Sequence, residues 1–414
     1  MHLYRLFHGK LGAEDSVRSV SSVEKTITMA RRAVISSGGL KGYLLEEVVA
    51  SLISKAGYRL LTDPQDDPHD LSLMGNGLQV RGRGGYHQAD VLGELSWAPA
   101  FGNPIRLFIE AKWRGEGRAK VGIPEVRHAV GILQDVNQVL VTVGPRTGAM
   151  KVGSNSEDIT SGGRCYCYTY RYALCSTLGF TSGAQAYALA HQVALLDLSH
   201  EDYDELRGAI DAVGDSLQGY IEGLDDDGPV DSPTTRNSLL RRIRATLRQE
   251  LWHVPFEDYD HRFLSMLGPL ITATREISEL FVGVSATGFV ILFKADHPDR
   301  MIRHMRADAD PETSVHFRTH EDGSSRWEIR VSSDRAEPCK LFFVLPDAML
   351  RALDDKQESG PRAAMNLKEQ HFSRVTVYRI TDEKSMICSL KLNRDWLANA
   401  RLQLESRNRR KPPS

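Results

Sequence analysis

The segment at residues 105–114, Ile-Arg-Leu-Phe-Ile-Glu-Ala-Lys-Trp-Arg, places the strongest constraint on how this chain can fold. Its alternation predicts a β-strand, because successive side chains of a strand point to opposite faces. One face would carry Ile105, Leu107, Ile109 and Ala111, and the other Phe108, Glu110 and Lys112. A half-buried strand tolerates a carboxylate and an ammonium only when they pair or hold something between them. The pattern therefore predicts either a same-face ion pair or a metal site with an adjacent catalytic lysine.

The flanking segments predict an α/β domain around this strand. Asp90-Val-Leu-Gly-Glu-Leu is a second strand candidate, and a turn at 97–104 would bring Asp90 beside Glu110. The other elements expected are an amphipathic helix at 42–56, a helix at 124–137, strands at 138–143 and 164–178, a helix capped by Thr181 or Ser182, and a strand at 195–198. This order is typical of an α/β domain with a mixed sheet flanked by helices, spanning 42–200.

The rest of the chain divides by composition. Residues 1–41 predict an N-terminal appendage, with a short helix at 23–35 that ends in a loop at 36–39. Residues 201–235 predict a helix and an acidic, proline-bearing linker. Residues 236–405 predict a separate C-terminal α+β domain, with strands expected at 280–293, 314–319, 326–331, 341–345, 375–380 and 386–392. The basic tail at 406–414 predicts disorder.

The C-terminal domain would open with a basic helix at 236–251. Its aliphatic stripe is flanked by Arg241, Arg242, Arg244 and Arg248. Such patterns occur more often on solvated helix faces than in contacts with DNA or a partner. We therefore expect these arginines to face solvent, with a DNA or partner contact as the alternative.

Charge and cysteine content narrow the classes of function. The formal net charge of −2 over 414 residues gives no global indication of nucleic-acid binding, so such binding would depend on local basic patches. The five cysteines include no CxxC pair, which argues against a zinc site or a disulfide framework. The first residues lack a signal-peptide pattern and no segment reaches transmembrane length, so we expect a cytoplasmic protein without membrane contact.

Asp90, Glu110 and Lys112 form the pattern D-x19-E-x-K, which suits metal-dependent phosphodiester hydrolysis. Two carboxylates on adjacent strands can hold Mg²⁺, or Mn²⁺ in its place, with the Ala111 carbonyl and waters completing the oxygen shell. The metal would polarise a phosphodiester oxygen and lower the pKa of a bound water. Lys112 would orient that water or stabilise charge on the phosphate. Glu46, on the helix at 42–56, would join the metal shell or hold a water, although favourable charge near a helix N-terminus is a sufficient alternative.

Basic and polar residues on both sides of the two strands are candidates for DNA contact. The glycine-rich stretch at 75–85 lacks the spacing of a nucleotide-binding loop, so we expect its arginines to contact a polyanion instead. The candidates for phosphate contact are Arg81, Arg83, Arg114, Arg118 and Lys120, and the candidates for contact with the scissile phosphate or a water are His87 and Gln88. Each basic residue could instead be ordinary surface charge, and His87 could equally brace its loop.

These segments resemble the Mrr-like restriction endonuclease family, within the PD-(D/E)xK nuclease superfamily. Four matches occur in the family's order: the helix at 43–58 with Glu46, the acidic motif at 87–91, the strand at 108–114, and the late loop and helix at 176–198. The resemblance covers 42–200, under half of the chain, with Ala89 where the superfamily name has proline and Glu110 where many members have glutamine. It implies a restriction-endonuclease-like fold and Mg²⁺-dependent cleavage of double-stranded DNA, most often in bacterial restriction or anti-phage defence.

Three classes of function remain open at this point. The first is a DNA endonuclease whose C-terminal domain supplies target choice, oligomerisation or coupling to a partner subunit of a defence system. The second is a non-cleaving module that uses a nuclease-like fold to bind DNA or a partner. The third is a nuclease for RNA or branched DNA. Double-strand cutting by a protein with one site per chain usually implies a homodimer.

Overall fold

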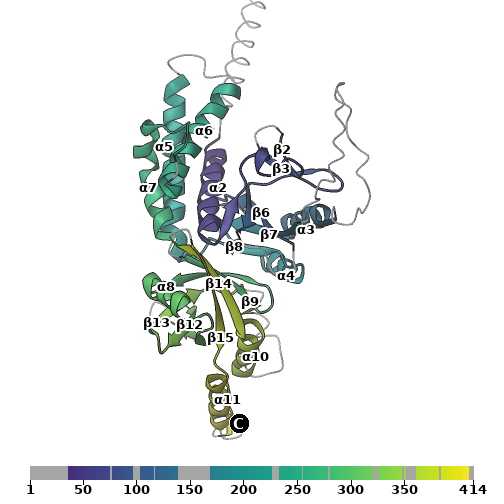
Figure 1. The fold of residues 1–414 in the computed structure, drawn as a ribbon, viewed down its shortest axis with the longest axis vertical. Coiled ribbons are helices and arrows are strands. Elements are labelled where there is room, and N and C mark those ends of the chain that lie inside the picture. The colour runs from purple at the N-terminus through teal and green to yellow at the C-terminus, as the bar shows by residue number, and fades with distance from the viewer. Residues whose placement is uncertain are drawn as a thin grey trace, which may run out of the picture.

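The structure is a computed structural model, and the residues that it describes are 36–74, 77–96, 103–115, 117–138, 168–225, 233–253, 255–277, 280–319, 325–346, 349–350, 360–381 and 384–409. Figure 1 shows a layer of helices and sheets above a β-rich unit, with the C-terminal helix at the far end. The expected helix at 23–35 lies outside the described residues, as do residues 139–143 of the strand expected at 138–143 and most of the acidic linker. None of the described helices is both long enough and apolar enough to cross a membrane.

A five-stranded mixed sheet forms the centre of the N-terminal part. Its order is β1 (Tyr58–Leu60), β5 (Val91–Leu95), β6 (Ile105–Lys112), β7 (Thr169–Ser176) and β8 (Ala194–Asp197). β5 pairs antiparallel with both β1 and β6, whereas β7 runs parallel to both β6 and β8. The mixed sheet, the strand within 105–114 and the strand that follows Asp90 are therefore confirmed.

Helices cover both faces of this sheet, and successive side chains of β6 pack into a different hydrophobic cluster on each face. Leu107 and Ile109 share a hydrophobic cluster with α2 (Ser37–Lys55), whereas Phe108 belongs to a second cluster with α3 (Ile123–Gln138) and α4 (Ser182–Ala190). Thr181 caps α4, as predicted, by accepting the N–H of Ala184.

The loop expected at 36–39 is wrong, because α2 begins there. The Ser36 side chain accepts the N–H of Gly39 and so satisfies one of the free donors of the first turn. Leu40 is 1% exposed and anchors that turn in the core. The cap and this burial offset the poor helix propensity of Gly38 and Gly39.

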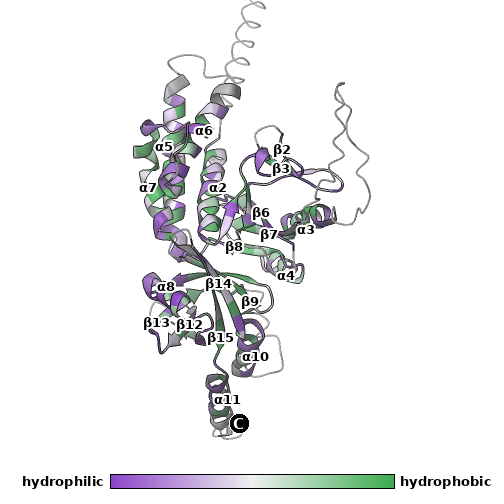
Figure 2. Cartoon of the chain, in the orientation of Figure 1, coloured by the Kyte–Doolittle hydropathy of each residue, from purple (hydrophilic) through white to green (hydrophobic). Residues whose placement is uncertain are grey.

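Three more helices extend the same core beyond residue 200. α5 (Asp204–Asp225), α6 (Pro233–Trp252) and α7 (His261–Ile277) share one hydrophobic cluster with α2, and Figure 1 shows them beside it. Figure 2 shows hydrophobic and hydrophilic residues side by side along these helices, as one buried and one solvated face require. The basic helix that we expected in a separate C-terminal domain thus packs on the N-terminal part.

The expectation that the arginines of this helix face solvent holds for Arg241, which is exposed, and is wrong for Arg244 and Arg248. The guanidinium groups of Arg244 and Arg248 both pair with the buried Glu47 carboxylate of α2. Since α6 and α2 share a core, the face of α6 that carries these two arginines meets a helix rather than water.

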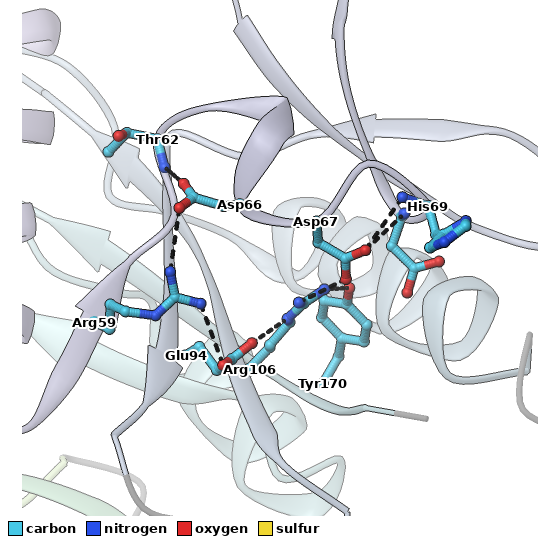
Figure 3. A network of polar contacts seen from close by, with 9 residues as sticks. Arg59, Thr62, Asp66, Asp67, His69, Glu94, Arg106 and Tyr170 are labelled. Carbon is cyan, nitrogen blue, oxygen red and sulfur yellow. Dashed lines mark hydrogen bonds and ion pairs between the residues drawn. The ribbon is translucent and has the colours of Figure 1, made fainter. Parts of the chain in front are cut away.

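An insertion between β1 and β5 is fastened to the sheet by the buried Arg106 of β6. The insertion contains a short turn of helix, η1 (Pro64–Asp66), and a small antiparallel sheet of β2 (Leu71–Met74), β3 (Gly77–Arg81) and β4 (Tyr86–Gln88). Arg106 donates to Asp67 Oδ2 at 2.7 Å, Glu94 Oε2 at 3.0 Å and the Tyr170 hydroxyl at 3.0 Å (Figure 3). Its charge is thus matched by two carboxylates inside the protein, as a buried guanidinium requires.

We expect Tyr170→Phe to lower the free energy of unfolding by about 2 kcal/mol, since a hydrogen bond to a charged group contributes about 1.5–3 kcal/mol. Arg106 is 0% exposed, so the donor that loses the hydroxyl cannot turn to water. Denaturant unfolding of the purified variant measures this loss. Tyr220→Phe on α5 is the control, because the described residues offer its hydroxyl no hydrogen-bond partner, and it should change stability by less than about 0.5 kcal/mol. Equal losses in both variants would contradict this role of Tyr170.

The C-terminal part contains a closed seven-stranded barrel in the order β10-β13-β12-β11-β15-β14-β9. Its strands are β9 (Leu280–Ser285), β10 (Val290–Ala295), β11 (Glu312–Thr319), β12 (Ser325–Ser333), β13 (Ala336–Phe343), β14 (Arg374–Thr381) and β15 (Lys384–Leu392). The helices α8 (Pro298–Ala307), α10 (Gly360–Phe372) and α11 (Arg394–Arg409) accompany it. The expected combination of helices and strands is confirmed, whereas closure into a barrel was not predicted.

Two local expectations in this part are wrong. The single strand expected at 280–293 is a hairpin, because Gly288 adopts a left-handed backbone (φ 81°) and turns the chain between β9 and β10. Residues 406–409 continue α11 instead of starting a disordered tail.

Candidate active site

Asp90 and the pair Glu110 and Lys112 lie at neighbouring ends of β5 and β6. The antiparallel register of the two strands pairs Val91 with Ile109, which places Asp90 next to the end of β6. The Asp90 carboxylate Oδ2 accepts the backbone N–H of Ala111 at 2.8 Å. The hairpin thus brings Asp90 to the residue that separates Glu110 from Lys112, as the spacing in the sequence predicted.

The Glu110 carboxylate is held by two neighbours. Lys112 Nζ forms an ion pair with Oε1, which confirms the predicted same-face pair. The Tyr172 hydroxyl donates to Oε2 at 2.9 Å. Both partners leave the carboxylate partly exposed, with 18% of the Glu110 side chain accessible to solvent. Glu110 is therefore oriented in advance and still reachable by a ligand.

Tyr172 is a site residue that reasoning from the sequence missed. It comes from β7, and its ring stacks on Phe108 with centroids 4.9 Å apart. The parallel register pairs it with Phe108, two residues before Glu110 on the same face of β6. The alternation within β7 was visible in the sequence, but the register between two parallel strands was not.

Glu46 also faces this site, from the middle of α2. Because α2 begins at Ser37, the alternative role of charge near a helix N-terminus does not apply to Glu46. It lines a cavity of about 260 Å³ together with Asp90 and Gln88. Burial and the Asp90 carboxylate raise the pKa of Glu46 to about 8, against the opposing effect of Arg244. Burial also raises the pKa of Asp90, although the Ala111 N–H and Lys112 oppose it.

This arrangement of carboxyl groups suits a hard divalent cation. The Asp90 carboxylate raises the pKa of Glu46, and the Glu110 carboxylate raises that of Asp90, so the charged forms of these neighbours disfavour one another. A cation relieves that cost. Asp90, Glu110 and the Ala111 carbonyl offer only oxygen ligands, which Mg²⁺ and Mn²⁺ accept. Among the described residues, no group of three or more His, Cys, Asp or Glu side chains forms a metal cage. Mg²⁺ needs no such cage, because it keeps several waters and binds through one or two carboxylates.

The candidates for DNA contact on the insertion lie at different distances from the Asp90 cavity. Arg81 ends β3, and the exposed Arg83 follows in the turn that leads to β4. Gln88 ends β4 and lines the Asp90 cavity. His87 lies between them but pairs with Asp135 of α3 through Nε2 at 2.8 Å, while Asp135 also accepts the Gly84 N–H. His87 therefore braces its loop in this structure, which is the alternative role given above.

The candidates after β6 are more widely separated. Arg114 directly follows the strand, and its Nη2 pairs with Glu125 of α3 at 3.1 Å. Arg118 is exposed in the next loop. Lys120 lines a different cavity, of about 490 Å³, with Asp197 and other residues from β8 and the barrel. The structure thus does not bring Lys120 to the Asp90 cavity.

Arg244 and Arg248 of α6 lie beside the site, a neighbourhood that the sequence did not reveal. Both line the Asp90 cavity. The helix was recognisably basic, but its partner Glu47 lies 197 residues before Arg244 in the chain. Only the packing of α6 on α2 brings them together.

Comparisons with known proteins found no relative of this chain, so its function is inferred from the geometry of the site. No family model, no curated protein and no solved structure matches the chain.

Proposed function

We propose that this protein is a Mg²⁺-dependent endonuclease that hydrolyses phosphodiester bonds of double-stranded DNA. The observation that carries the proposal is the hydrogen bond from the Ala111 N–H to Asp90, beside the Glu110–Lys112 pair. It gathers two carboxylates and one ammonium at the end of a single hairpin. The mixed sheet flanked by helices agrees with the restriction-endonuclease-like fold that the motif resemblance implies.

In the proposed reaction a water oxygen attacks the phosphorus and gives up its proton. The bond from phosphorus to one sugar oxygen of the DNA breaks, and that oxygen takes up a proton. Asp90, Glu110 and the Ala111 carbonyl would hold Mg²⁺, which supplies a Lewis acid and a water of lowered pKa when bound. Lys112 orients the water or stabilises the negative charge that develops on the phosphate. Tyr172 keeps the Glu110 carboxylate in place, and Glu46 holds a water or completes the metal shell.

The basic residues around the site support a nucleic-acid substrate. Arg81 and Arg83 on the insertion, and Arg114 and Arg118 after β6, would contact phosphates on either side of the scissile bond, since such contacts position a protein without reading sequence. Cutting both strands with one site per chain favours a homodimer on DNA. A role in restriction or anti-phage defence, with or without a partner subunit, is the setting that the resemblance implies.

Incubation of the purified full chain with supercoiled plasmid tests the proposal. Nicked and linear DNA in the presence of Mg²⁺ or Mn²⁺, and intact plasmid in EDTA, is the expected result. Parallel reactions with RNA and with branched DNA identify the preferred substrate. Plasmid binding without cleavage in either metal would instead indicate a non-cleaving module.

We expect Tyr172→Phe to lower the cleavage rate about tenfold. The variant loses one hydrogen bond to a charged carboxylate, and about 1.4 kcal/mol corresponds to tenfold in rate. Single-turnover plasmid cleavage at saturating Mg²⁺ measures the effect. Tyr187→Phe on α4 is the control, because its ring contacts His191 rather than the site. An unchanged rate in Tyr172→Phe would remove Tyr172 from the site.

A further inference from the structure

Helix α6 lies outside the five-stranded sheet but forms part of the wall of the Asp90 cavity. Leu240, Arg244 and Arg248 of α6 line this cavity opposite Glu46 and Glu47 of α2. The Tyr43 hydroxyl of α2 donates to the Leu240 carbonyl at 3.0 Å and joins the two helices here. The site therefore includes a helix that lies more than 100 residues beyond β6 in the sequence.

The two arginines of this wall differ in their contacts. Arg248 donates to Glu47 through Nε at 2.7 Å and Nη2 at 3.1 Å, and its guanidinium lies over the Trp252 ring. Arg244 pairs with Glu47 through Nε, and its Nη2 also reaches Glu46 Oε2 at 3.5 Å. Arg244 thus links the buried carboxylate of α2 to the carboxylate that faces Asp90.

The Arg244 guanidinium is held in this position from a third side. Its carbon lies 4.4 Å from the centroid of the Tyr43 ring, within the range of a cation–π contact. Tyr43 is itself fixed by its bond to Leu240, one turn before Arg244 on α6. Arg244 therefore has one defined orientation, directed at Glu46.

We propose that Arg244 is a positioning residue for Glu46, through which α6 sets the orientation of a carboxylate beside the metal site. The inference rests on the proposed nuclease function. Glu46 lines the same cavity as two other carboxyl groups, Asp90 and Glu47, and Arg244 forms an ion pair with it there. Without this contact, the Glu46 side chain could turn away from Asp90 and from any metal held there.

Comparison of Arg244→Met with Arg248→Met tests the inference. Each substitution keeps an unbranched side chain and removes one partner of Glu47, so both should lower the melting temperature. Only Arg244→Met removes the Glu46 contact. We expect it to raise the Mg²⁺ concentration for half-maximal cleavage about tenfold, in line with the loss of groups that orient metal ligands. Arg248→Met should stay within about twofold of wild type in that concentration, since it leaves the proposed ligands and their orientation unchanged.

Two lysine variants keep the test decisive if the methionine variants fail to fold. Arg244→Lys keeps the charge near Glu46, so its Mg²⁺ requirement should lie between those of wild type and Arg244→Met, and Arg248→Lys is its control. Equal changes of the Mg²⁺ concentration for half-maximal cleavage in the Arg244 and Arg248 variants would overturn the inference and leave the proposed function standing. Absence of metal-dependent cleavage by the wild-type protein would instead reject the proposed function, and this inference with it.

Discussion

Glu110→Ala and Lys112→Ala should each lower the rate of Mg²⁺-dependent plasmid cleavage by about 10²–10³-fold, the range for loss of a group that stabilises charge in a transition state. Glu110→Ala removes the carboxylate that would bind the metal. Lys112→Ala removes the ammonium that acts on the water or the phosphate. Single-turnover rates at saturating DNA and Mg²⁺ measure both losses.

Neither substitution should unfold the protein, which makes the loss of activity interpretable. The Glu110 and Lys112 side chains are 18% and 31% exposed, and ion pairs with such access to solvent contribute about 0–1 kcal/mol. Thermal unfolding and plasmid binding in Ca²⁺ should therefore stay close to wild type. Lys340→Ala, at an exposed position of β13, is the control for loss of a lysine and should cleave normally. Full cleavage by both Glu110→Ala and Lys112→Ala would refute the site assignment.

Glu47→Ala should lower the free energy of unfolding by about 3–5 kcal/mol, because removing one partner of a buried ion pair leaves uncompensated charge behind. Glu47 is 2% exposed and is the common partner of Arg244 and Arg248. The variant would keep both guanidinium groups at the junction of α2 and α6 without their carboxylate. Denaturant unfolding at pH 7 measures the loss. Glu222→Ala, at an exposed position of α5, should cost no more than about 0.5 kcal/mol.

The pH dependence gives an independent check on Glu47. Burial alone would raise its pKa, but Arg248 and Arg244 outweigh this effect and hold the pKa below the ordinary value of 4.5. A carboxyl group whose pKa is depressed by folding stabilises the protein above its unfolded pKa and loses that contribution as the pH falls. The stability gap between wild type and Glu47→Ala should therefore be full near neutral pH and shrink below about pH 4.5. A gap that stays constant down to pH 3 would show that Glu47 acts through packing alone.

Much of β6, the strand that carries Glu110 and Lys112, was predictable because its information is local. The alternation between residues 105 and 112 identified a strand, put Leu107 and Phe108 on opposite faces, and placed Glu110 beside Lys112. The spacing from Asp90 predicted a hairpin, and the Ala111 N–H bond confirms that neighbourhood. A period of two residues along a strand depends only on backbone geometry, so the sequence carries it directly.

The start of α2 shows where local patterns failed. Two serines and two glycines are typical of a loop, yet Ser36 caps a helix whose first turn is anchored by Leu40. The Ser36 cap contributes about 1 kcal/mol and burial of one leucine about 1.5–3 kcal/mol, which together exceed the propensity cost of about 2 kcal/mol for two glycines. Tertiary packing therefore outweighed intrinsic propensity at this end.

The sequence alone supplied the candidate metal-binding motif, the strand that bears it and the mixed α/β class, since each of these follows from spacing within a short stretch of chain. The contacts that complete the site came from the folded chain: Tyr172 through a parallel register, and Arg244 through helix packing across 197 residues. Closure of the barrel also came only from the folded chain, because it requires β9 to pair with both β10 and the distant β14. Such contacts are selected by the burial of a shared core, and no local periodicity specifies which distant segments will share one.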